Sequence, residues 1–365
     1  MPFTAPVRRT AARLTTLVAA VLTVFMTVAL SPATGPVGAA TTTVNGALAA
    51  GPGMLAAAPD GNDDEGVSPS LRKQLEAASK GYLDAQAALD NSIKRQKELT
   101  AHLAAIEAEL GVRSGSVGEL AGAAYRTGRL GPVAALLNSN SPDGFFDRAT
   151  TLGVVASSEE RQVRKLIETR EEETRAKTAL DNEIREQRKQ VAVMASRKQQ
   201  AERALAAVGS GGTSSGVRGT NTGTAKPAPR NSDGSWPRES CSVNDPTTSG
   251  CITPRTLHAL NQAKAAGYTR YVSCYRSGGS GEHPKGRACD FAAQKGGFGG
   301  VATGGDRTYG NNLAAYYVKN ASRLGVLYVI WFKQIWLPSS GWKAYNGGNG
   351  DPSSDHTNHV HLSVY

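Results

Sequence analysis

An apolar heptad repeat in the first third of the chain leaves little freedom in how that region can fold. From Leu71 the repeat steps alternately by four and three residues, and it keeps this register across a polar interruption at Ser92 and Gln96. Its apolar positions are Leu71, Leu75, Ala78, Tyr82, Ala85, Leu89, Leu99, Leu103, Ile106 and Leu110. Such a stripe is stable only when another helix packs against it. With Ser68 at the position of an N-terminal cap, the sequence predicts a long coiled-coil helix.

A second helical segment, residues 157–208, carries a weaker stripe in which Arg170, Glu173 and Lys177 occupy inward positions. Its apolar members are Leu180, Ile184, Val191, Met194, Leu205 and Val208. Because this helix buries little apolar surface by itself, we expect it to pair antiparallel with the first helix. The predicted unit is therefore a coiled-coil hairpin spanning residues 67–208.

The stretch between the two helices is apolar but broken at Gly131, Pro132 and Pro142. This pattern predicts short helices that cap the far end of the hairpin. Two interpretations follow from their apolar content. The short helices enclose a small core of their own, which we favour, or they present a docking face.

The first forty residues have the pattern of a secretory signal peptide. Arg8, Arg9 and Arg13 precede a long apolar run, and small residues follow it, with a cleavage site expected near Ala39 or Ala40. The alternative is a retained membrane anchor, because the apolar run is long. Residues 41–66 are rich in Ala, Gly, Thr and Asp, and we expect them to be disordered.

Residues 209–235 are of low complexity, and their Gly, Ser, Thr and Pro content predicts a flexible linker. Residues 236–365 contain all four Trp and all four Cys, and they are numerous enough for one core. The expected elements in this segment are two helices and several strands, ending in a strand at the C-terminus. The fold class predicted for the whole chain is α+β, with a helical hairpin joined to a small domain that has an antiparallel sheet.

The four cysteines are confined to this last segment. An even number in an exported domain favours two disulfides, and four cysteines allow three pairings. We predict Cys241 with Cys251 and Cys274 with Cys289. A cysteine-rich zinc site is the competing interpretation, but the sequence contains no C-x-x-C pair to support it.

The formal net charge is +10, and the sequence pI is about 9.5. An exported protein of this charge is attracted to polyanions such as cell-wall polymers. Nucleic acid is not an expected partner, because export separates the protein from it and no stripe of Lys and Arg interleaved with aromatics is present.

Histidine and aspartate residues of the last segment suggest a metal site. His283 and Asp290 lie seven positions apart across a turn, and His359 and His361 lie two apart in the last predicted strand. Two residues that are two apart in a strand project from the same face. Catalytic zinc sites use three His or carboxylate ligands and leave one position open. His283, Asp290 and one terminal histidine can supply that set, while the other histidine holds or deprotonates the attacking water.

The stretch from Cys274 to Phe291, together with the terminal H-V-H, resembles zinc peptidoglycan peptidases, which include the lysostaphin-type endopeptidases and the D-Ala-D-Ala metallopeptidases. Their pattern is Ser-x-His-x-x-Gly-x-Ala-x-Asp followed by His-x-His or Glu-x-x-His. This chain has Gly281 in place of the serine, and Asn358 where the second form has glutamate. The resemblance covers residues 236–365 and favours an endopeptidase over a carboxypeptidase.

The resemblance implies zinc on His283, Asp290 and His361, with His359 as a catalytic residue. It also implies that Arg276 binds a substrate carboxylate or stabilises the developing oxyanion. His356 would then be an outer partner or an alternative ligand, and Asp355 would orient a histidine ring.

The helical half resembles the coiled-coil regions of secreted actinobacterial wall hydrolases, chiefly in the stretch from Ala124 to Arg148. That resemblance implies regulation by the coiled coil and docking on a membrane-embedded cell-division complex. The resulting expectation is an exported, cell-wall-associated zinc peptidase acting on peptidoglycan. Two alternatives of other classes stay open: a non-catalytic wall-binding adaptor that activates another hydrolase, and a zinc that serves only to stabilise the fold.

Overall fold

The computed structural model describes residues 68–365 except 129–130, 221–222 and 280. The predicted signal peptide and the predicted disordered segment therefore lie outside the described residues. Within the described part of the chain, no helix has both the length and the apolar character needed to cross a membrane.

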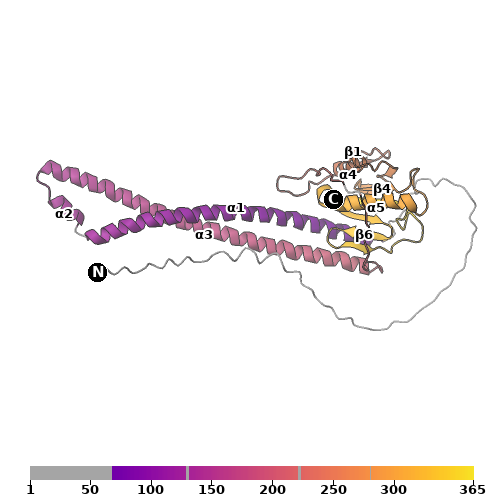
Figure 1. Ribbon diagram of the computed structural model, residues 1–365, viewed down its shortest axis with the longest axis horizontal. Helices are drawn as coiled ribbons and strands as arrows, with labels where there is room; N and C mark the ends of the chain where they lie inside the picture. The colour runs from indigo at the N-terminus through magenta and orange to yellow at the C-terminus, as the bar shows by residue number, and fades with distance from the viewer. Residues whose placement is uncertain (1–67, 129–130, 221–222, 280) are drawn as a thin grey trace, which may run out of the picture. The chain divides into compact units, whose positions relative to one another are not determined.

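The N-terminal half is a helical hairpin, as predicted. Helix α1 spans Pro69–Thr127, α2 spans Gly131–Leu137 and α3 spans Pro142–Ala206. Figure 1 shows α2 between the end of α1 and the start of α3. The predicted cap is present, because the Leu71 amide donates to the Ser68 hydroxyl at 3.3 Å. Ser141 caps α3 in the same way, with its hydroxyl accepting from Gly144 at 3.1 Å. This second cap explains why α3 begins at Pro142, well before the predicted start at residue 157.

The seam of α1 follows the predicted register, and the seam of α3 follows it only in part: Leu180 and Met194 are half-buried and Leu205 is buried, as predicted. Along α3 the less exposed residues recur in a heptad of their own: Thr169, Glu173, Ala176, Leu180, Glu183, Gln187, Gln190, Met194, Arg197, Ala201 and Ala204. Val191 was predicted to face inward, but it is 55% exposed. Polar pairs explain the difference. Gln187 donates to Gln96 across the hairpin at 2.8 Å, and Arg95 pairs with Glu183 at 2.8 Å. Apolar spacing alone could not reveal a seam built partly from polar residues.

The far end of the hairpin has no core. Among the described residues from 107 to 168, none is buried. Several large apolar side chains are instead open to solvent, including Val112, Tyr125, Leu137, Phe146 and Val154. The favoured prediction of a small core at this end is therefore wrong for the described residues, and the apolar side chains are exposed there.

The C-terminal half is an α+β domain, which confirms the predicted fold class. Its elements are β1 (Val243–Asn244), β2 (Cys251–Ile252), α4 (Pro254–Ala265), β3 (Val272–Ser273), η1 (His283–Lys285), β4 (Ala288–Ala292), α5 (Gly304–Lys319), α6 (Ala321–Leu324), β5 (Val326–Trp331), β6 (Gln334–Leu337), β7 (Gly341–Ala344) and β8 (His359–Val364). Six strands form one antiparallel sheet in the order β3-β4-β8-β5-β6-β7. The C-terminal strand β8 therefore lies inside the sheet, between β4 and β5.

The two faces of this sheet have different neighbours. Val360, Leu362 and Val364 of β8 point into the main core, which also contains apolar residues of α4 and α5. The intervening residues His359, His361 and Ser363 point to the opposite face. All six residues of β8 are buried, so both faces of the central strand are covered. The hydrophobic core thus lies on one face of the sheet and the candidate site on the other.

The low-complexity stretch 209–235 does not behave as the flexible linker that its composition predicted. Gly211 donates to the Ala344 carbonyl at the edge of β7, at 2.9 Å. Ala225 is 3% exposed, and its amide donates to the Asn320 side chain at 2.8 Å. At Gly219 an added Cβ would lie 2.7 Å from the Cβ of Ala315. Small side chains allow this segment to lie close against α5 and the sheet edge, so its Gly and Ala content serves packing as well as flexibility.

The base of the hairpin packs against the domain. Apolar residues from the start of α1 and the end of α3 share one buried cluster with residues of β5 and β6. The cluster consists of Leu71, Leu75, Ala78, Leu83, Ala201, Ala204, Leu205, Ala228, Trp236, Leu327, Tyr328, Ile330, Ile335, Leu337 and Tyr345. Beside it, Glu76 of α1 forms ion pairs with Lys285 at 2.8 Å and with Arg287.

Candidate metal centre

Strand register places three polar side chains at one point of the sheet. Asp290 of β4 lies directly opposite His361 of β8, and Ala292 lies opposite His359. In an antiparallel pair, directly opposed residues project from the same face. His359 and His361 therefore share the face of Asp290, as the spacing of the H-V-H motif predicted.

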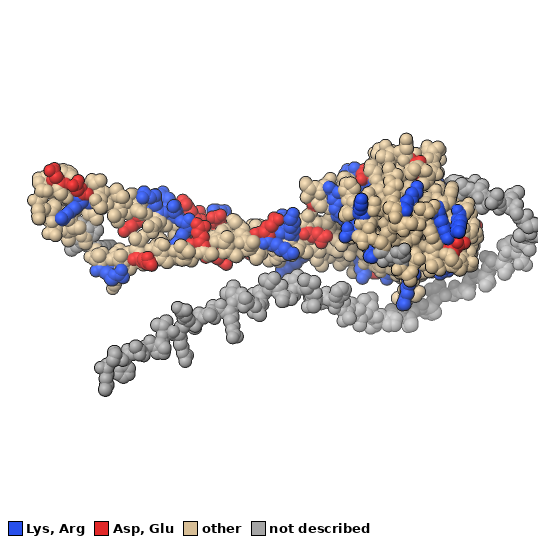
Figure 2. All heavy atoms as spheres, turned by 45° about the horizontal axis from the view of Figure 1, so that its top comes forward, with Lys and Arg blue, Asp and Glu red and all other residues tan. Residues whose placement is uncertain are grey.

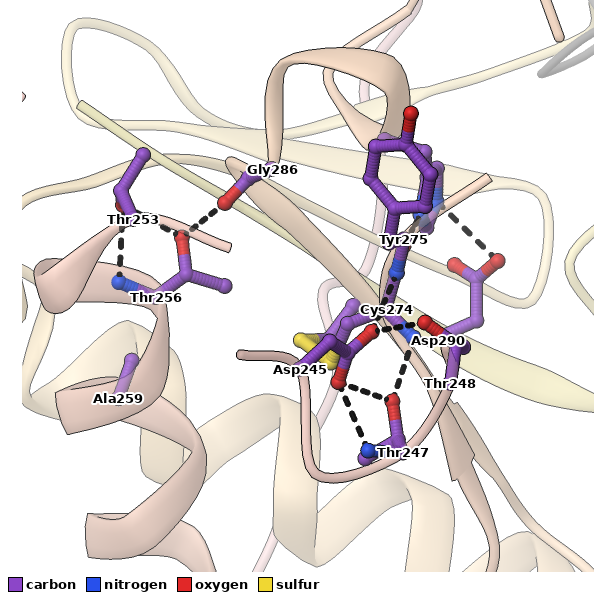
Figure 3. Close-up of a disulfide and its surroundings, with 12 residues drawn as sticks. Asp245, Thr247, Thr248, Thr253, Thr256, Ala259, Cys274, Tyr275, Gly286 and Asp290 are labelled. Carbon is purple, nitrogen blue, oxygen red and sulfur yellow. Dashed lines mark hydrogen bonds and ion pairs between the residues drawn. A yellow bond between two sulfur atoms is a disulfide. The ribbon is translucent and has the colours of Figure 1, made fainter. Parts of the chain in front are cut away.

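His283 reaches the same point from a short turn outside the sheet. This turn, η1, is closed by Gly286 at φ +68°, a left-handed conformation that favours glycine. An added Cβ at Gly286 would lie 2.8 Å from the Ile252 Cα, so the turn also packs directly on backbone. The Gly286 carbonyl accepts bonds from the Thr253 amide at 2.9 Å and from the Thr256 hydroxyl at 2.8 Å, as Figure 3 shows for Thr256. The glycine three residues after His283 thus anchors the turn to the start of α4.

The three predicted ligands converge. Ligand atoms of His283, Asp290 and His361 all lie within 4.8 Å of one another. His361 Nδ1 is 2.9 Å from Asp290 Oδ1, and His283 Nε2 is 3.2 Å from Asp290 Oδ2. The two imidazole nitrogens are 3.3 Å apart. Tetrahedral ligands at zinc–nitrogen distances of about 2.0 Å are about 3.3 Å from each other. The three groups are therefore spaced as the corners of a metal coordination shell.

The outward-facing nitrogens of these rings have hydrogen-bond partners that orient the rings. His283 Nδ1 lies against the Cys274 carbonyl, which can only accept a hydrogen bond. The proton is therefore on Nδ1, and Nε2 presents its lone pair to the site. His361 Nε2 lies 2.8 Å from the Ser363 hydroxyl, and its Nδ1 faces Asp290. Both rings thus face Asp290, and the three residues form a group that can hold a metal ion.

His359 lies beside this trio with its Nε2 3.5 Å from Asp290 Oδ1. Its Nδ1 donates to the Asn358 side-chain oxygen at 2.7 Å, so Nε2 is the basic nitrogen. Burial lowers the pKa of His359 to about 4, against the opposing attraction of Asp290. At neutral pH the ring is therefore neutral and able to accept a proton.

His356 packs on the same group of rings, 4.8 Å from the His359 ring and 5.8 Å from the His361 ring. Burial, followed by the charges of His359 and His361, holds the pKa of His356 well below its usual value. Its Nδ1 is 3.1 Å from the Ser354 carbonyl. Asp355 was predicted to orient a histidine ring, but its carboxylate pairs with Lys333 at 2.7 Å instead. Its own turn directs Asp355 away from the site.

Arg276 contacts the site through Asp290, with Nη1 3.1 Å from Asp290 Oδ2. Burial raises the pKa of Asp290, but the charges of His283, His359 and Arg276 outweigh it and hold the pKa well below its usual value. Asp290 is therefore ionised, as a ligand must be. The Arg276 side chain is 17% exposed, so its guanidinium lies at the margin of the site.

Both predicted disulfides are confirmed: Cys241 pairs with Cys251, and Cys274 pairs with Cys289. The second bond joins the residue whose carbonyl accepts from His283 to the residue that precedes Asp290. Figure 3 shows a further anchor at this point, where the carboxylate of Asp245 accepts from the Tyr275 amide at 2.8 Å. Cys274 is therefore held from two sides, beside two of the three candidate ligands.

Removing this bond should weaken metal binding. In a Cys274→Ser/Cys289→Ser variant, Cys274, whose carbonyl orients the His283 ring, loses its covalent link to β4. We expect metal affinity to fall about 10–100-fold, the usual cost of losing an outer partner of a metal ligand. The matched control is Cys241→Ser/Cys251→Ser, which removes the disulfide beside Gly286 but leaves the Cys274–Cys289 bond intact. Isothermal titration of both variants with zinc checks this, and equal losses in the two would contradict a special role for the Cys274–Cys289 bond.

The depressed pKa of His359 predicts loss of stability in acid for the metal-free protein. The unfolded chain binds a proton at this histidine below about pH 6.5, whereas the folded ring stays neutral down to about pH 4. The free energy of unfolding should therefore decrease as the pH falls through this interval, by about 3 kcal/mol for this one group. Urea unfolding of chelator-treated protein between pH 7 and 4 measures this decrease. A His359→Gln variant should show a smaller decrease, and identical slopes would contradict the assignment.

Sequence reasoning missed several residues that support the site. Ser363, two residues after His361 in β8, could have been found by extending the same strand alternation. Asn358 was considered only as a missing glutamate, yet it holds the His359 ring. No local pattern indicated the contact of Tyr328, whose ring stacks on His361 with centroids 5.5 Å apart.

The comparisons with known proteins concern the same region. Residues 248–360 match the family model described as VldE, C-terminal domain. The match includes Arg276, His283, Asp290 and His359, and it ends one residue before His361. It leaves out the helical hairpin. No curated protein matches the chain.

Proposed function

We propose that the C-terminal domain is a zinc-dependent peptidase that hydrolyses peptide bonds in peptidoglycan stem peptides or cross-links. The observation that carries this proposal is the convergence of His283, Asp290 and His361 beside a neutral His359. A structural metal site has its coordination shell filled by protein, whereas a catalytic one leaves a position open beside a base. Three ligands beside the basic nitrogen of His359 correspond to the catalytic arrangement.

Each residue of the proposed site has its own chemical role. Zinc bound by His283, Asp290 and His361 would supply Lewis acidity and make a water molecule more acidic. His359 accepts the proton of that water at Nε2, because its other nitrogen is already committed to Asn358. Arg276 places a positive charge at the edge of the site, where it favours a substrate carboxylate or a developing oxyanion.

Charge and compartment support the choice of substrate. Peptidoglycan stems and other wall polymers carry negative charge, and basic residues outnumber acidic ones in residues 236–365. On the face seen in Figure 2, both signs alternate along the hairpin, whereas Lys and Arg predominate over the domain. The two disulfides are typical of an oxidising compartment, which fits the proposed export to the cell wall.

The decisive experiment is mass spectrometry of products released from purified peptidoglycan by the zinc-loaded chain, with and without chelator. New amino and carboxyl termini within stem peptides, lost on chelation, are expected. If the loaded protein leaves peptidoglycan intact but stimulates a separate hydrolase, the non-catalytic adaptor is the better interpretation. Unchanged cleavage by metal-free protein would refute the zinc mechanism.

We further propose that the hairpin restrains the site from its base. Tyr328, which stacks on His361, belongs to the apolar cluster that includes Leu71 and Leu75 of α1. Glu76 pairs with Lys285 and Arg287, which closely follow His283. The exposed apolar residues at the far end of the hairpin would then receive the partner that relieves this restraint, for which a membrane-embedded cell-division complex is our candidate.

Loosening the base should raise activity. Glu76→Ala removes the ion pairs to Lys285 and Arg287 while leaving the candidate ligands unchanged. We expect peptidoglycan cleavage to increase several-fold, because the Glu76–Arg287 pair is largely buried and such pairs contribute more than exposed ones. Glu107→Ala is the matched control, since Glu107 pairs with Lys177 in the middle of the hairpin with both side chains about half exposed. An equal response in the two variants, measured as kcat/KM, would contradict restraint at the base.

A further inference from the structure

The candidate site is closed in this structure. Exposure is 2% for His283, 2% for Asp290, 6% for His359 and 0% for His361. A peptide substrate cannot reach groups this deeply buried unless a neighbouring segment moves. The segment that moves must cover the site while being held by few contacts of its own.

Aromatic rings cover the histidines from several sides, and two of these rings are buried. Tyr328 lies within β5, and Tyr345 packs against His356; each is 3% exposed. Phe298 differs from both. Its ring centroid is 5.4 Å from that of His359, yet its side chain is only half-buried and it lies in a loop.

The loop around Phe298 is rich in glycine, and its own contacts include a bridge between Gln294 and Gly297 and the ring of Tyr271 against Phe298. Two glycines precede Phe298 and two follow it, in the sequence Gly296-Gly297-Phe298-Gly299-Gly300. Gly297 has φ +132°, a conformation that other residues rarely adopt. Both ends of the loop are fixed, because Ala293 donates to the Asn358 carbonyl at 2.9 Å and Ala302 donates to the Thr357 carbonyl at 2.8 Å. Residues 295–300 lie between these two anchors, and we call this segment the Phe298 loop.

One side chain connects the Phe298 loop to the proton-accepting histidine. The amide nitrogen of Asn358 donates to the Gly299 carbonyl at 2.8 Å and to the Ser353 hydroxyl at 2.9 Å. The oxygen of the same amide accepts from His359 Nδ1 at 2.7 Å. Asn358 is 2% exposed, so these bonds are shielded from water. The position of the loop and the orientation of His359 therefore depend on a single planar group.

We propose that Phe298 contacts the substrate and determines its specificity, and that Asn358 is a positioning residue that aligns His359 when the Phe298 loop closes. This inference rests on the proposed peptidase function and goes beyond it. With the loop open, the substrate reaches the site. On closure the Phe298 ring covers the substrate beside His359, excludes water and favours small side chains such as those of alanine and glycine. The Gly299–Asn358 bond then forms and holds the imidazole in its proton-accepting orientation.

The test compares Phe298→Ala, Asn358→Ala and Asn358→Asp with the control Val301→Ala. Val301 is 51% exposed and lies just beyond the movable segment. Asn358→Asp keeps the acceptor for His359 but removes the donor to Gly299, whereas Asn358→Ala removes both. Two measurements are made on each protein: the rate at which diethyl pyrocarbonate modifies His359 in metal-free protein, followed by peptide mass spectrometry, and kcat and KM for stem peptides of differing side-chain size.

We expect His359 modification to accelerate about 10-fold in Phe298→Ala and in both Asn358 variants, and to stay unchanged in Val301→Ala. Phe298→Ala should lower the preference for alanine over leucine peptides about 10-fold, the usual discrimination of an apolar wall. Asn358→Ala should lower kcat, and Asn358→Asp should restore part of it. Unchanged modification in every variant overturns the loop proposal. If the wild-type chain cleaves no peptide, the modification rates still decide whether the loop guards the site, so the two proposals can fail separately.

Discussion

Replacing His283 with alanine should abolish metal binding and with it the cleavage of peptidoglycan. The ring contributes Nε2 to the ligand trio, and its orientation is set by the Cys274 carbonyl. Loss of an outer partner alone costs about 10–100-fold in metal affinity, so loss of a direct ligand should exceed about 100-fold. Metal content by mass spectrometry and cleavage rate by chromatography of released peptides measure the two effects. Asp290→Ala should behave in the same way.

The matched control for this prediction is His258→Ala. His258 belongs to the same domain but lies on α4, where its ring contacts the Lys226 carbonyl at 2.8 Å. Its removal should leave metal content and cleavage unchanged. If His283→Ala bound one metal ion with wild-type affinity, the ligand assignment would be wrong and the enzymatic proposal would lose its foundation.

His359→Ala should separate catalysis from metal binding. His359 Nε2 is 3.5 Å from Asp290 Oδ1, and the ring lies outside the trio whose ligand atoms converge. We therefore expect the variant to retain its metal while cleavage falls about 10²–10⁴-fold, the usual contribution of a positioned general base. The remaining activity should lose its dependence on a group that titrates below neutral pH. Parallel metal analysis and a pH–rate profile measure both effects.

Loss of the metal from His359→Ala would instead change the role assigned to His359. If His359→Ala lost its metal to the same extent as His283→Ala, His359 would be a fourth ligand and the site would be a filled, structural one. The metal would then stabilise the domain without catalysing a reaction, and thermal unfolding with and without chelator would show the size of that contribution.

Much of the fold could be predicted because it depends on patterns that a short stretch of chain sets by itself. The heptad spacing in α1 requires a partner helix, whatever the rest of the chain does. The terminal H-V-H motif places both imidazoles on one face, because side chains in a strand alternate.

The errors occurred where distant segments meet. The seam of α3 runs through Glu183 and Gln187 because Arg95 and Gln96 of α1 face them, which the spacing of apolar residues in α3 cannot show. Residues 209–235 have the composition of a linker, but Asn320 and the edge of β7 hold them against the domain. The far end of the hairpin is apolar without being buried, because the chain supplies no partner there among the described residues.

The sequence by itself determined the elements: two long helices that must pair, a disulfide-bonded α+β domain and a strand presenting two histidines to one side. Only the tertiary structure decided that Asp290 and His361 are direct partners across β4 and β8, that the η1 turn brings His283 to them, and that Asn358 joins the Phe298 loop to His359. The physical reason is the distance along the chain over which each of these effects acts. Backbone periodicity depends on the few residues of each segment, so it can be recognised in the sequence. Strand register and the convergence of side chains depend on how all segments bury their apolar surfaces together.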